Sequence, residues 1–302
     1  MLAAHVDTMP FGDEAAWEYS PLSGLIKDGK IYGRGSGDDK NGLAVAWYVI
    51  KAIKECGIKI DRNILIGSYV DEECGGGNGA LGLALKYPVD SLINLDCSGF
   101  EAEAYGGGCY KLVLKTTKND KAIASVFDVC QGINLINEKL MELDRREKTT
   151  IRLSSVEAGR GGTKEGVINL AIYTDMPKEK TQKTFDEICE SLKPEFDKLN
   201  LATDGFKLTT RYFIYGETDK NSAEVKVLSE LIKERTGEYP DTRGTCISDL
   251  SLMMHYGCKN SFNYGMLRGS ATGGGAHQPN EHITCENLLN LAKTVALIIM
   301  RT

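Results

Sequence analysis

The sequence predicts an α/β fold with a mostly parallel central sheet flanked by helices, and a smaller α+β domain inserted into it. Up to about residue 105, segments with helical spacing of apolar residues alternate with short apolar runs typical of buried strands, which favours a parallel sheet. The segment 107–212 is instead rich in lysine and glutamate and alternates strands with charged helices. Amphipathic helical patterns return afterwards, so residues 1–106 and 213–302 are expected to form one domain.

In this first domain, residues 1–4 are expected to form the end of a buried strand that leads into His5 and Asp7. A domain rarely begins inside a core strand. We therefore expect that an N-terminal segment is missing, or that the chain is a minimal version of its fold. Trp47 and Ile50 are expected on the buried side of the first helix. The expected helices span residues 42–58, 79–86, 222–236 and 287–300, and the expected strands span residues 63–69 and 91–95.

The inserted domain follows Gly106-Gly107-Gly108, where three glycines interrupt the pattern. It contains none of the four histidines of the chain, which are His5, His255, His277 and His282. His255 lies in an apolar helical run, where a packed structural histidine is expected. The strands expected in the insert span residues 110–116, 150–155 and 167–173, and its helices span residues 133–143 and 180–199.

The composition is that of an ordinary globular protein, with 42% hydrophobic and 26% charged residues. A net charge of −6 argues against a general electrostatic attraction for nucleic acid. No apolar run is long enough to span a bilayer and no signal peptide is recognised, so a cytoplasmic protein without membrane partners is expected. Nine cysteines without a C-x-x-C pair argue against a disulfide framework and a structural zinc site.

Histidines and carboxylates follow the predicted strands and glycine-rich loops in several short strings. They are His5-Val6-Asp7, Gly35-Ser36-Gly37-Asp38-Asp39-Lys40, Asp71-Glu72-Glu73, Asp96 after its strand, and Gly275-Ala276-His277-Gln278-Pro279-Asn280-Glu281. Ligands bind at the carboxyl ends of strands in such sheets, so we expect these side chains to meet. Imidazoles with carboxylates suit zinc, manganese or cobalt, and one carboxylate can bridge two cations about 3.5–4 Å apart. Each string alone is equally compatible with a solvated turn.

In two of these strings, one residue can bind a metal while a nearby residue has a supporting role. His5 and Asp7 are two residues apart on the predicted strand and therefore face the same side, where Asp7 can accept a hydrogen bond from His5 or flank it. Of Glu72 and Glu73, one can bind metal while the other takes a proton from a metal-bound water, whose pKa falls to about 7. The missing G-x-x-x-x-G-K-[ST] pattern argues against a phosphate-binding loop.

In this order, the strings resemble the di-zinc metallohydrolase family of acylases, desuccinylases, glutamate carboxypeptidase and cytosolic di- and tripeptidases. The similarity covers residues 5–107 and 216–302, and residues 10–35 are most similar to the PepV-like dipeptidases. The resemblance implies a cis peptide bond between Asp38 and Asp39. It also implies roles for seven residues: Asp38 as the bridging ligand, His5 and Asp96 on one metal, Glu73 and His277 on the other, Glu72 as general base and Asp7 as the partner of His5.

Aspartate at the position of Asp96 is usual in the di- and tripeptidases of this family, which favours a substrate with a free amino end. The insert resembles the family's lid, yet residues 107–212 lack the histidine that commonly reaches a neighbouring active site. The Gly161-Gly162 pair lacks its usual asparagine, and Leu250 stands where an arginine is common. Arg268 is the candidate to hold a substrate carboxylate.

We therefore expect a zinc-dependent peptidase of short peptides, with manganese or cobalt as alternative metals, a metal-bound water as nucleophile and Glu72 as its base. The inserted lid is expected to pair two copies as a homodimer. Two alternatives stay open on the sequence alone. One is a deacylase or desuccinylase of N-acyl amino acids, and the other is a catalytically impaired relative that binds metal or peptide.

Overall fold

The computed structural model describes residues 1–75, 77–96, 99–116, 126–147, 149–158, 165–209, 214–243, 248–266 and 273–302. The described residues divide into two compact units. Unit 1 consists of Met1–Ala104 with Gly216–Thr302, and unit 2 of Tyr105–Tyr215. Both units have a sheet and helices of their own, and each is described by itself below.

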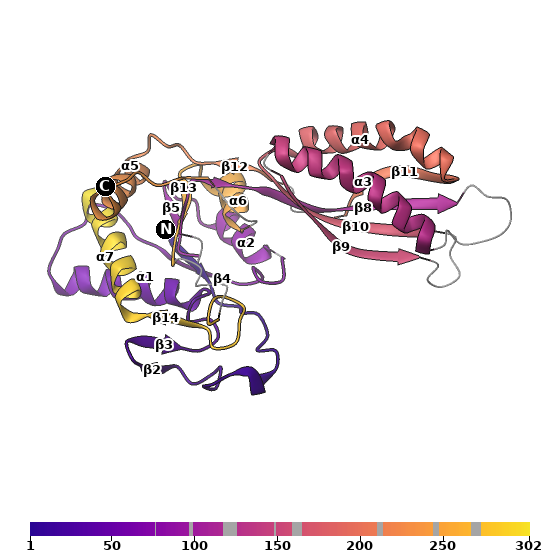
Figure 1. Ribbon diagram of the computed structural model, residues 1–302. Coiled ribbons are helices and arrows are strands. Elements are labelled where there is room, and N and C mark those ends of the chain that lie inside the picture. The colour runs from indigo at the N-terminus through magenta and orange to yellow at the C-terminus, as the bar shows by residue number, and fades with distance from the viewer. Residues whose placement is uncertain are drawn as a thin grey trace. The chain divides into compact units, whose positions relative to one another are not determined.

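Unit 1 is built on a five-stranded sheet in the order β4-β1-β5-β13-β6 (Figure 1). Neighbouring strands run parallel except for β6, which pairs antiparallel with β13. The strands are β1 (Leu2–His5), β4 (Ile66–Tyr69), β5 (Leu92–Asn94), β6 (Phe100–Glu101) and β13 (Ser261–Tyr264). This mostly parallel sheet with flanking helices confirms the predicted fold class.

Helices cover both faces of the sheet. Successive side chains of a strand point to opposite faces, and on β1 both sets are apolar and pack against helices. Leu2 and Ala4 of β1 belong to one hydrophobic cluster and Ala3 to another. The first cluster also contains side chains of α1 (Lys40–Glu55), α5 (Ala223–Thr236) and α7 (Cys285–Arg301). The second contains side chains of α2 (Asn78–Lys86) and of the helical turn Met253–Gly257, which follows the short α6 (Leu250–Leu252).

Short antiparallel strands complete unit 1. One group is β14-β3-β2 and the other is β12-β7. Their bounds are β2 (Leu25–Lys27), β3 (Lys30–Tyr32), β7 (Glu103–Ala104), β12 (Gly216–Glu217) and β14 (His282–Thr284). A single turn of 3-10 helix spans Glu14–Ala16. None of the helices among the described residues has both the length and the apolar sequence needed to cross a membrane.

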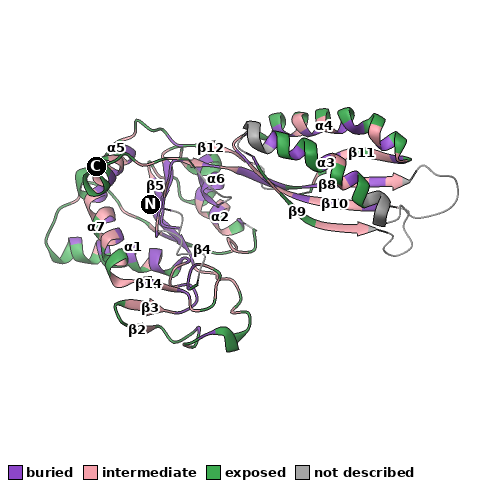
Figure 2. Cartoon of the chain, in the orientation of Figure 1, coloured by how far each residue is buried: buried purple, intermediate pink, exposed green. Residues whose placement is uncertain are grey.

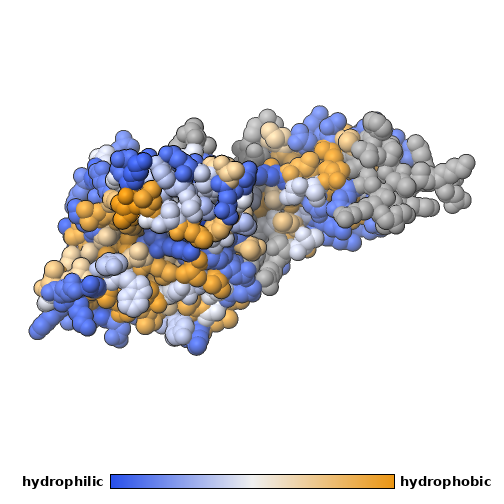
Figure 3. Space-filling view, turned by 90° about the horizontal axis from the view of Figure 1, so that it is seen from below, coloured by the Kyte–Doolittle hydropathy of each residue, from blue (hydrophilic) through white to orange (hydrophobic). Residues whose placement is uncertain are grey.

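Helix α1 packs Ile50 against the core, as expected, but turns Trp47 away from it. Its buried residues include Val45 and Val49, whereas Trp47 is 65% exposed. The reason is the closeness of the helix to the sheet: a Cβ at Gly42 would lie 2.9 Å from the side chains of Ala4 and Leu95, so small residues rather than an indole fill this contact. Exposed hydrophobic residues are therefore part of the surface of unit 1 (Figure 3). The expectation that His255 is packed was also wrong, because its side chain is exposed.

Unit 2 consists of a four-stranded antiparallel sheet in the order β11-β8-β10-β9, with two helices on one face (Figure 1). Alternate residues of β10 are buried and meet the buried side of α4, including Phe185 and Phe196, in a hydrophobic core (Figure 2). The sequence reading missed β11. The elements are β8 (Gly106–Thr116), α3 (Val126–Glu147), β9 (Thr150–Ala158), β10 (Glu165–Thr174), α4 (Lys178–Lys198) and β11 (Leu201–Leu208).

Candidate metal centre

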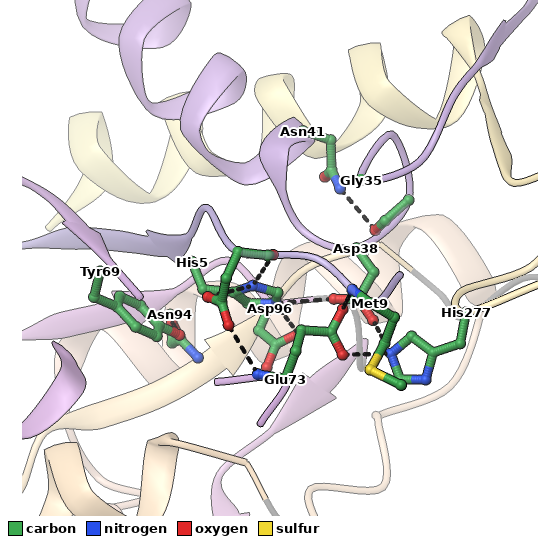
Figure 4. A network of polar contacts seen from close by, with 12 residues as sticks. His5, Met9, Gly35, Asp38, Asn41, Tyr69, Glu73, Asn94, Asp96 and His277 are labelled. Carbon is green, nitrogen blue, oxygen red and sulfur yellow. Dashed lines mark hydrogen bonds and ion pairs between the residues drawn. The ribbon is translucent and has the colours of Figure 1, made fainter. Parts of the chain in front are cut away.

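The five residues predicted as metal ligands point toward one another at one edge of the sheet of unit 1 (Figure 4). His5 is the last residue of β1, and Asp96 lies two residues beyond β5. Asp38 precedes α1, Glu73 follows β4, and His277 lies in the loop before β14. Because β1, β4 and β5 are parallel neighbours, their carboxyl ends meet at this edge, where ligands bind in such sheets.

The ligand atoms form two clusters that share Asp38. Its Oδ1 lies 2.9 Å from Nε2 of His5, and its Oδ2 lies 3.1 Å from Nε2 of His277. Oδ1 of Asp96 lies 3.9 Å from Nε2 of His5, and Oε2 of Glu73 lies 2.8 Å from Nε2 of His277. Within each cluster the three ligand atoms lie no more than 4.8 Å apart, so each cluster has the size of a single cation site.

The two clusters differ in their access to solvent. His5, Asp38 and Asp96 are 0%, 3% and 2% exposed, so the first cluster is closed. The side chain of His277 is 42% exposed, although Glu73 beside it is buried. Among the five candidate ligands, His277 is therefore the one with a solvent-exposed side chain.

The hydrogen bonds of His5 fix which ring nitrogen faces the first cluster. Nδ1 lies 3.0 Å from the backbone carbonyl of Asp7 and 3.5 Å from its Oδ1. A carbonyl only accepts, so Nδ1 carries a hydrogen, and Nε2 donates to the carboxylate of Asp38. A cation that displaced the proton of Nε2 would meet the lone pair of this nitrogen between Asp38 and Asp96. This is the arrangement of a metal-binding histidine.

Asp7 has a second contact that the sequence did not indicate. Strand β1 ends at His5, so Asp7 lies beyond the strand, contrary to expectation, and its position is not set by strand alternation. The backbone N–H of Glu73 donates to Oδ2 of Asp7 at 3.1 Å, and the N–H of Met9 donates to Oε1 of Glu73 at 3.0 Å. The segment after β1 therefore holds Glu73 as well as His5.

Negative charge dominates the centre, and the pKa values show it. Burial, together with the charge of Asp96, raises the pKa of Glu72 to about 9. Burial opposes protonation of His5, but its hydrogen bond with Asp38 and other nearby carboxylates raise its pKa to about 11. Hydrogen bonds to two carboxylates likewise raise the pKa of His277 to about 10. Two divalent cations would offset this charge and displace the protons, so the donor set fits such ions.

The peptide bond between Asp38 and Asp39 is cis, as the resemblance implied. Asp39 is completely buried, and neither of its carboxylate oxygens has a hydrogen-bond partner among the described residues. Burial and then the charge of Asp96 raise the pKa of Asp39 well above its usual value. The same two causes raise the pKa of Asp249, a further buried acid, to about 7.

A buried chain of hydrogen bonds runs across the sheet next to the centre. The hydroxyl of Tyr69 donates to Oδ1 of Asn94 at 2.8 Å, and Nδ2 of Asn94 donates to Oδ1 of Asn263 at 2.9 Å. Nδ2 of Asn263 donates in turn to Oε2 of Glu101 at 3.3 Å. The ring of Tyr69 lies 6.1 Å from that of His5, between centroids. These residues link four strands of the sheet at the level of the candidate ligands.

Sequence reasoning missed the most connected carboxylate of the region. Glu281 is fully buried, pairs with Arg34, and accepts hydrogen bonds from the loop that ends at Asp38. Its only signal in the sequence was a place four residues after His277, beside a glycine-rich string that contains the arginine. The substrate-binding candidate Arg268 and the Gly161-Gly162 pair lie outside the described residues.

Comparison with known proteins agrees with this architecture. The model of peptidase family M20/M25/M40 matches residues 1–301. A protein described as an uncharacterised metallohydrolase, from Methanocaldococcus jannaschii, is 26% identical over 329 aligned positions, which cover 97% of this chain and 78% of that protein.

Two solved structures share the fold over 99% of this chain and 79% of their own. They are a tripeptidase of Staphylococcus aureus, with a TM-score of 0.72 at 20% identity, and the aminopeptidase PepT of Bacillus cereus, with a TM-score of 0.71 at 22% identity. Because the family model matches nearly every residue, the chain belongs to peptidase family M20/M25/M40.

Proposed function

We propose that this chain hydrolyses short peptides with a free amino end and uses two divalent metal ions, zinc in the first place, with manganese or cobalt as alternatives. The observation that carries the proposal is the position of Asp38, whose two carboxylate oxygens each face a different histidine. His5 and Asp96 would complete the site of one ion, and Glu73 and His277 that of the other. Carboxylate bridging of this kind is typical of two-metal hydrolases.

When bound, the two ions would polarise the scissile carbonyl and lower the pKa of the attacking water to about 7. Glu72 would take a proton from this water as its oxygen bonds to the carbonyl carbon. The same proton would then pass from Glu72 to the leaving amine as the carbon–nitrogen bond breaks. Burial and the charge of Asp96 raise the pKa of Glu72 in the absence of ions, and two bound cations would lower it again, as a base that takes a proton from the water requires.

Two observations favour a short peptide with a free amino end. The third ligand of the closed cluster is an aspartate, Asp96, as is usual in the di- and tripeptidases that the sequence resembles. The similar structures include those of a tripeptidase and an aminopeptidase. We place this substrate on the side of the half-exposed His277, because the cluster of His5 is closed.

We also propose that unit 2 pairs two copies of the chain, in the manner expected of the lid. Strand β9 lies at an edge of its sheet, where backbone groups on one side lack a neighbouring strand. Leu153 on this strand is 53% exposed, and Met141 on α3 is 48% exposed. An edge strand with apolar neighbours is a suitable surface for pairing with its own copy.

The test of the proposed activity uses matched substrates. Metal-depleted protein is loaded with zinc, manganese or cobalt and given unblocked dipeptides beside the N-acetyl forms of the same dipeptides and N-succinyl amino acids. Hydrolysis confined to the unblocked dipeptides is the expected result. Hydrolysis confined to acylated compounds would assign the chain to the deacylases instead. Full metal loading without any hydrolysis would identify a relative that binds metal but has lost turnover.

A further inference from the structure

Glu281 holds the loop that presents Asp38. One of its oxygens, Oε1, accepts hydrogen bonds from the backbone N–H groups of Gly35 at 3.0 Å, Gly37 at 2.8 Å and Asp38 at 3.1 Å. Three donors on one buried oxygen fix the course of this loop up to the shared ligand. Hydrogen bonds to a charged acceptor are stronger than those between neutral groups, so the carboxylate matters here and not only its shape.

The other oxygen of Glu281 pairs with Arg34. Nη1 of Arg34 lies 2.5 Å from Oε2 of Glu281, and both side chains are buried. Nη2 of the same arginine donates to the backbone carbonyl of Pro10 at 3.3 Å, and its guanidinium lies 5.2 Å from the ring of Trp17. The ion pair therefore also holds the segment that follows β1.

These contacts reach all three ligands of the more exposed cluster. Asp38 ends the loop held by Glu281. The N–H of Met9, next to Pro10, donates to the carboxylate of Glu73. His277 lies four residues before Glu281, in a loop closed by a hydrogen bond of 3.0 Å from the N–H of His282 to the carbonyl of Gly274. By contrast, His5 ends a strand that pairs with β4, and Asp96 follows Leu95, whose N–H donates to the carbonyl of Ala3 in β1 at 2.7 Å, so these two ligands depend on the sheet.

We propose that the ion pair of Arg34 and Glu281 positions the metal site formed by Asp38, Glu73 and His277, and that its loss weakens this site more than the site of His5, Asp38 and Asp96. Arg34 and Glu281 are positioning residues, because they act through the loops that present the ligands. The inference rests on the proposed two-metal centre. If the ion pair had only a structural role, its replacement by neutral residues would leave the affinity of both metal sites unchanged, because the fold often tolerates such a replacement.

The experiment measures zinc binding to the whole chain by competition with a chromophoric chelator, which gives the number of sites and the affinity of each. Glu281→Gln removes the charge but keeps an acceptor oxygen. The double variant Arg34→Met with Glu281→Gln leaves no unpaired buried charge, so it tests the inference if the single variant does not fold. Glu103→Gln is the matched control, because it breaks an ion pair with Lys220 in the same unit, and Glu103 lies in β7, outside the loops that Arg34 and Glu281 hold. His277→Ala identifies which site is the weaker one.

Wild type and Glu103→Gln are expected to bind two zinc ions. Both ion-pair variants are expected to bind one ion about 10–100-fold more weakly than wild type, the range for residues that orient metal ligands. The other ion should lose less affinity, although Asp38 is a ligand in both sites. The weakened site should be the one lost in His277→Ala. Two sites of unchanged affinity, or equal weakening of both, would refute the positioning role while leaving the two-metal proposal intact. Fewer than two sites in wild type would refute the proposed metal centre, and this inference with it.

Discussion

The substitution Gly265→Ala should push the backbone after β13 away from the backbone of Asp96 at the candidate metal centre. Gly265 follows β13, and its N–H donates to the carbonyl of Gly99 at 3.1 Å. A Cβ on Gly265 would lie 2.5 Å from the carbonyl carbon of Asp96, which is 0.9 Å short of the 3.4 Å at which ordinary contact begins. The carbonyl oxygen of Asp96 would be closer still. All of these atoms are backbone, so no side chain can rotate away, and the segment that carries Asp96 must move by at least that amount.

The expected cost follows from this displacement. Overpacking typically costs about 1–3 kcal/mol, and we expect about 3 kcal/mol for Gly265→Ala because the backbone itself must shift. A displacement of about 1 Å at a catalytic site lowers rates by about 100-fold. Peptide hydrolysis by Gly265→Ala should therefore fall by about this factor at saturating metal, because Asp96 belongs to the closed cluster.

Urea unfolding followed by tryptophan fluorescence is the suitable assay. Both tryptophans of the chain, Trp17 and Trp47, belong to unit 1, so the signal reports on this unit. Metal-depleted protein separates packing from metal binding. Gly82→Ala in α2 is the control, because nothing lies within 4 Å of a Cβ there, and it should stabilise the protein by about 0.5–1 kcal/mol. If Gly265→Ala costs less than about 1 kcal/mol while the control behaves as expected, the close contact does not constrain Asp96.

Three further predictions concern catalysis, metal and assembly. Glu72→Gln should keep both metal ions but lower kcat by about 10²–10⁴-fold, the usual contribution of a general base. Glu73→Gln should instead lower the metal content. Kinetics together with elemental analysis of both variants will check this. Removal of metal by a chelator should lower the urea midpoint of unfolding, and zinc at about 1,000 times its Kd should restore about 4 kcal/mol per site; an unchanged midpoint would contradict metal binding to the folded state. Leu153→Asp should convert a dimer into a monomer in light scattering after gel filtration, while the exposed Leu22→Asp in unit 1 should leave the mass unchanged.

Parts of the fold with a clear periodicity were predictable from the sequence. The helical spacing of apolar residues located α5 and α7 to within a few residues, and the alternation of helices and strands indicated the parallel sheet. Strand β13 was missed, because its sequence Ser261-Phe262-Asn263-Tyr264 is not an apolar run although all four residues are buried. Asn263 is tolerated there because Asn94 and Glu101 satisfy its amide, which only the assembled sheet reveals.

The candidate ligands were recognisable for another reason: each lies in a short local string. The partnership of Arg34 with Glu281 has no local signature, since the two residues are 247 positions apart in the chain. In the sequence both read as charges in glycine-rich turns, which are usually solvated. Their burial arises only when the loops after β1 and β3 meet the loop before β14, and no spacing rule describes that encounter.

The contacts of the centre explain how so many carboxylates are held close together. Sheet register fixes His5, and the hydrogen bond from the N–H of Leu95 to the carbonyl of Ala3 joins the residue before Asp96 to β1; both are independent of any ion. Asp38 and Glu73 are instead oriented largely through backbone N–H groups: that of Asp38 donates to Glu281, and that of Glu73 donates to Asp7. Orientation through the backbone leaves the carboxylate oxygens of Asp38 and Glu73 facing the histidines, where a cation can bind them. The same arrangement places Asp38 and Glu73 beside the exposed His277, the side on which we place the substrate.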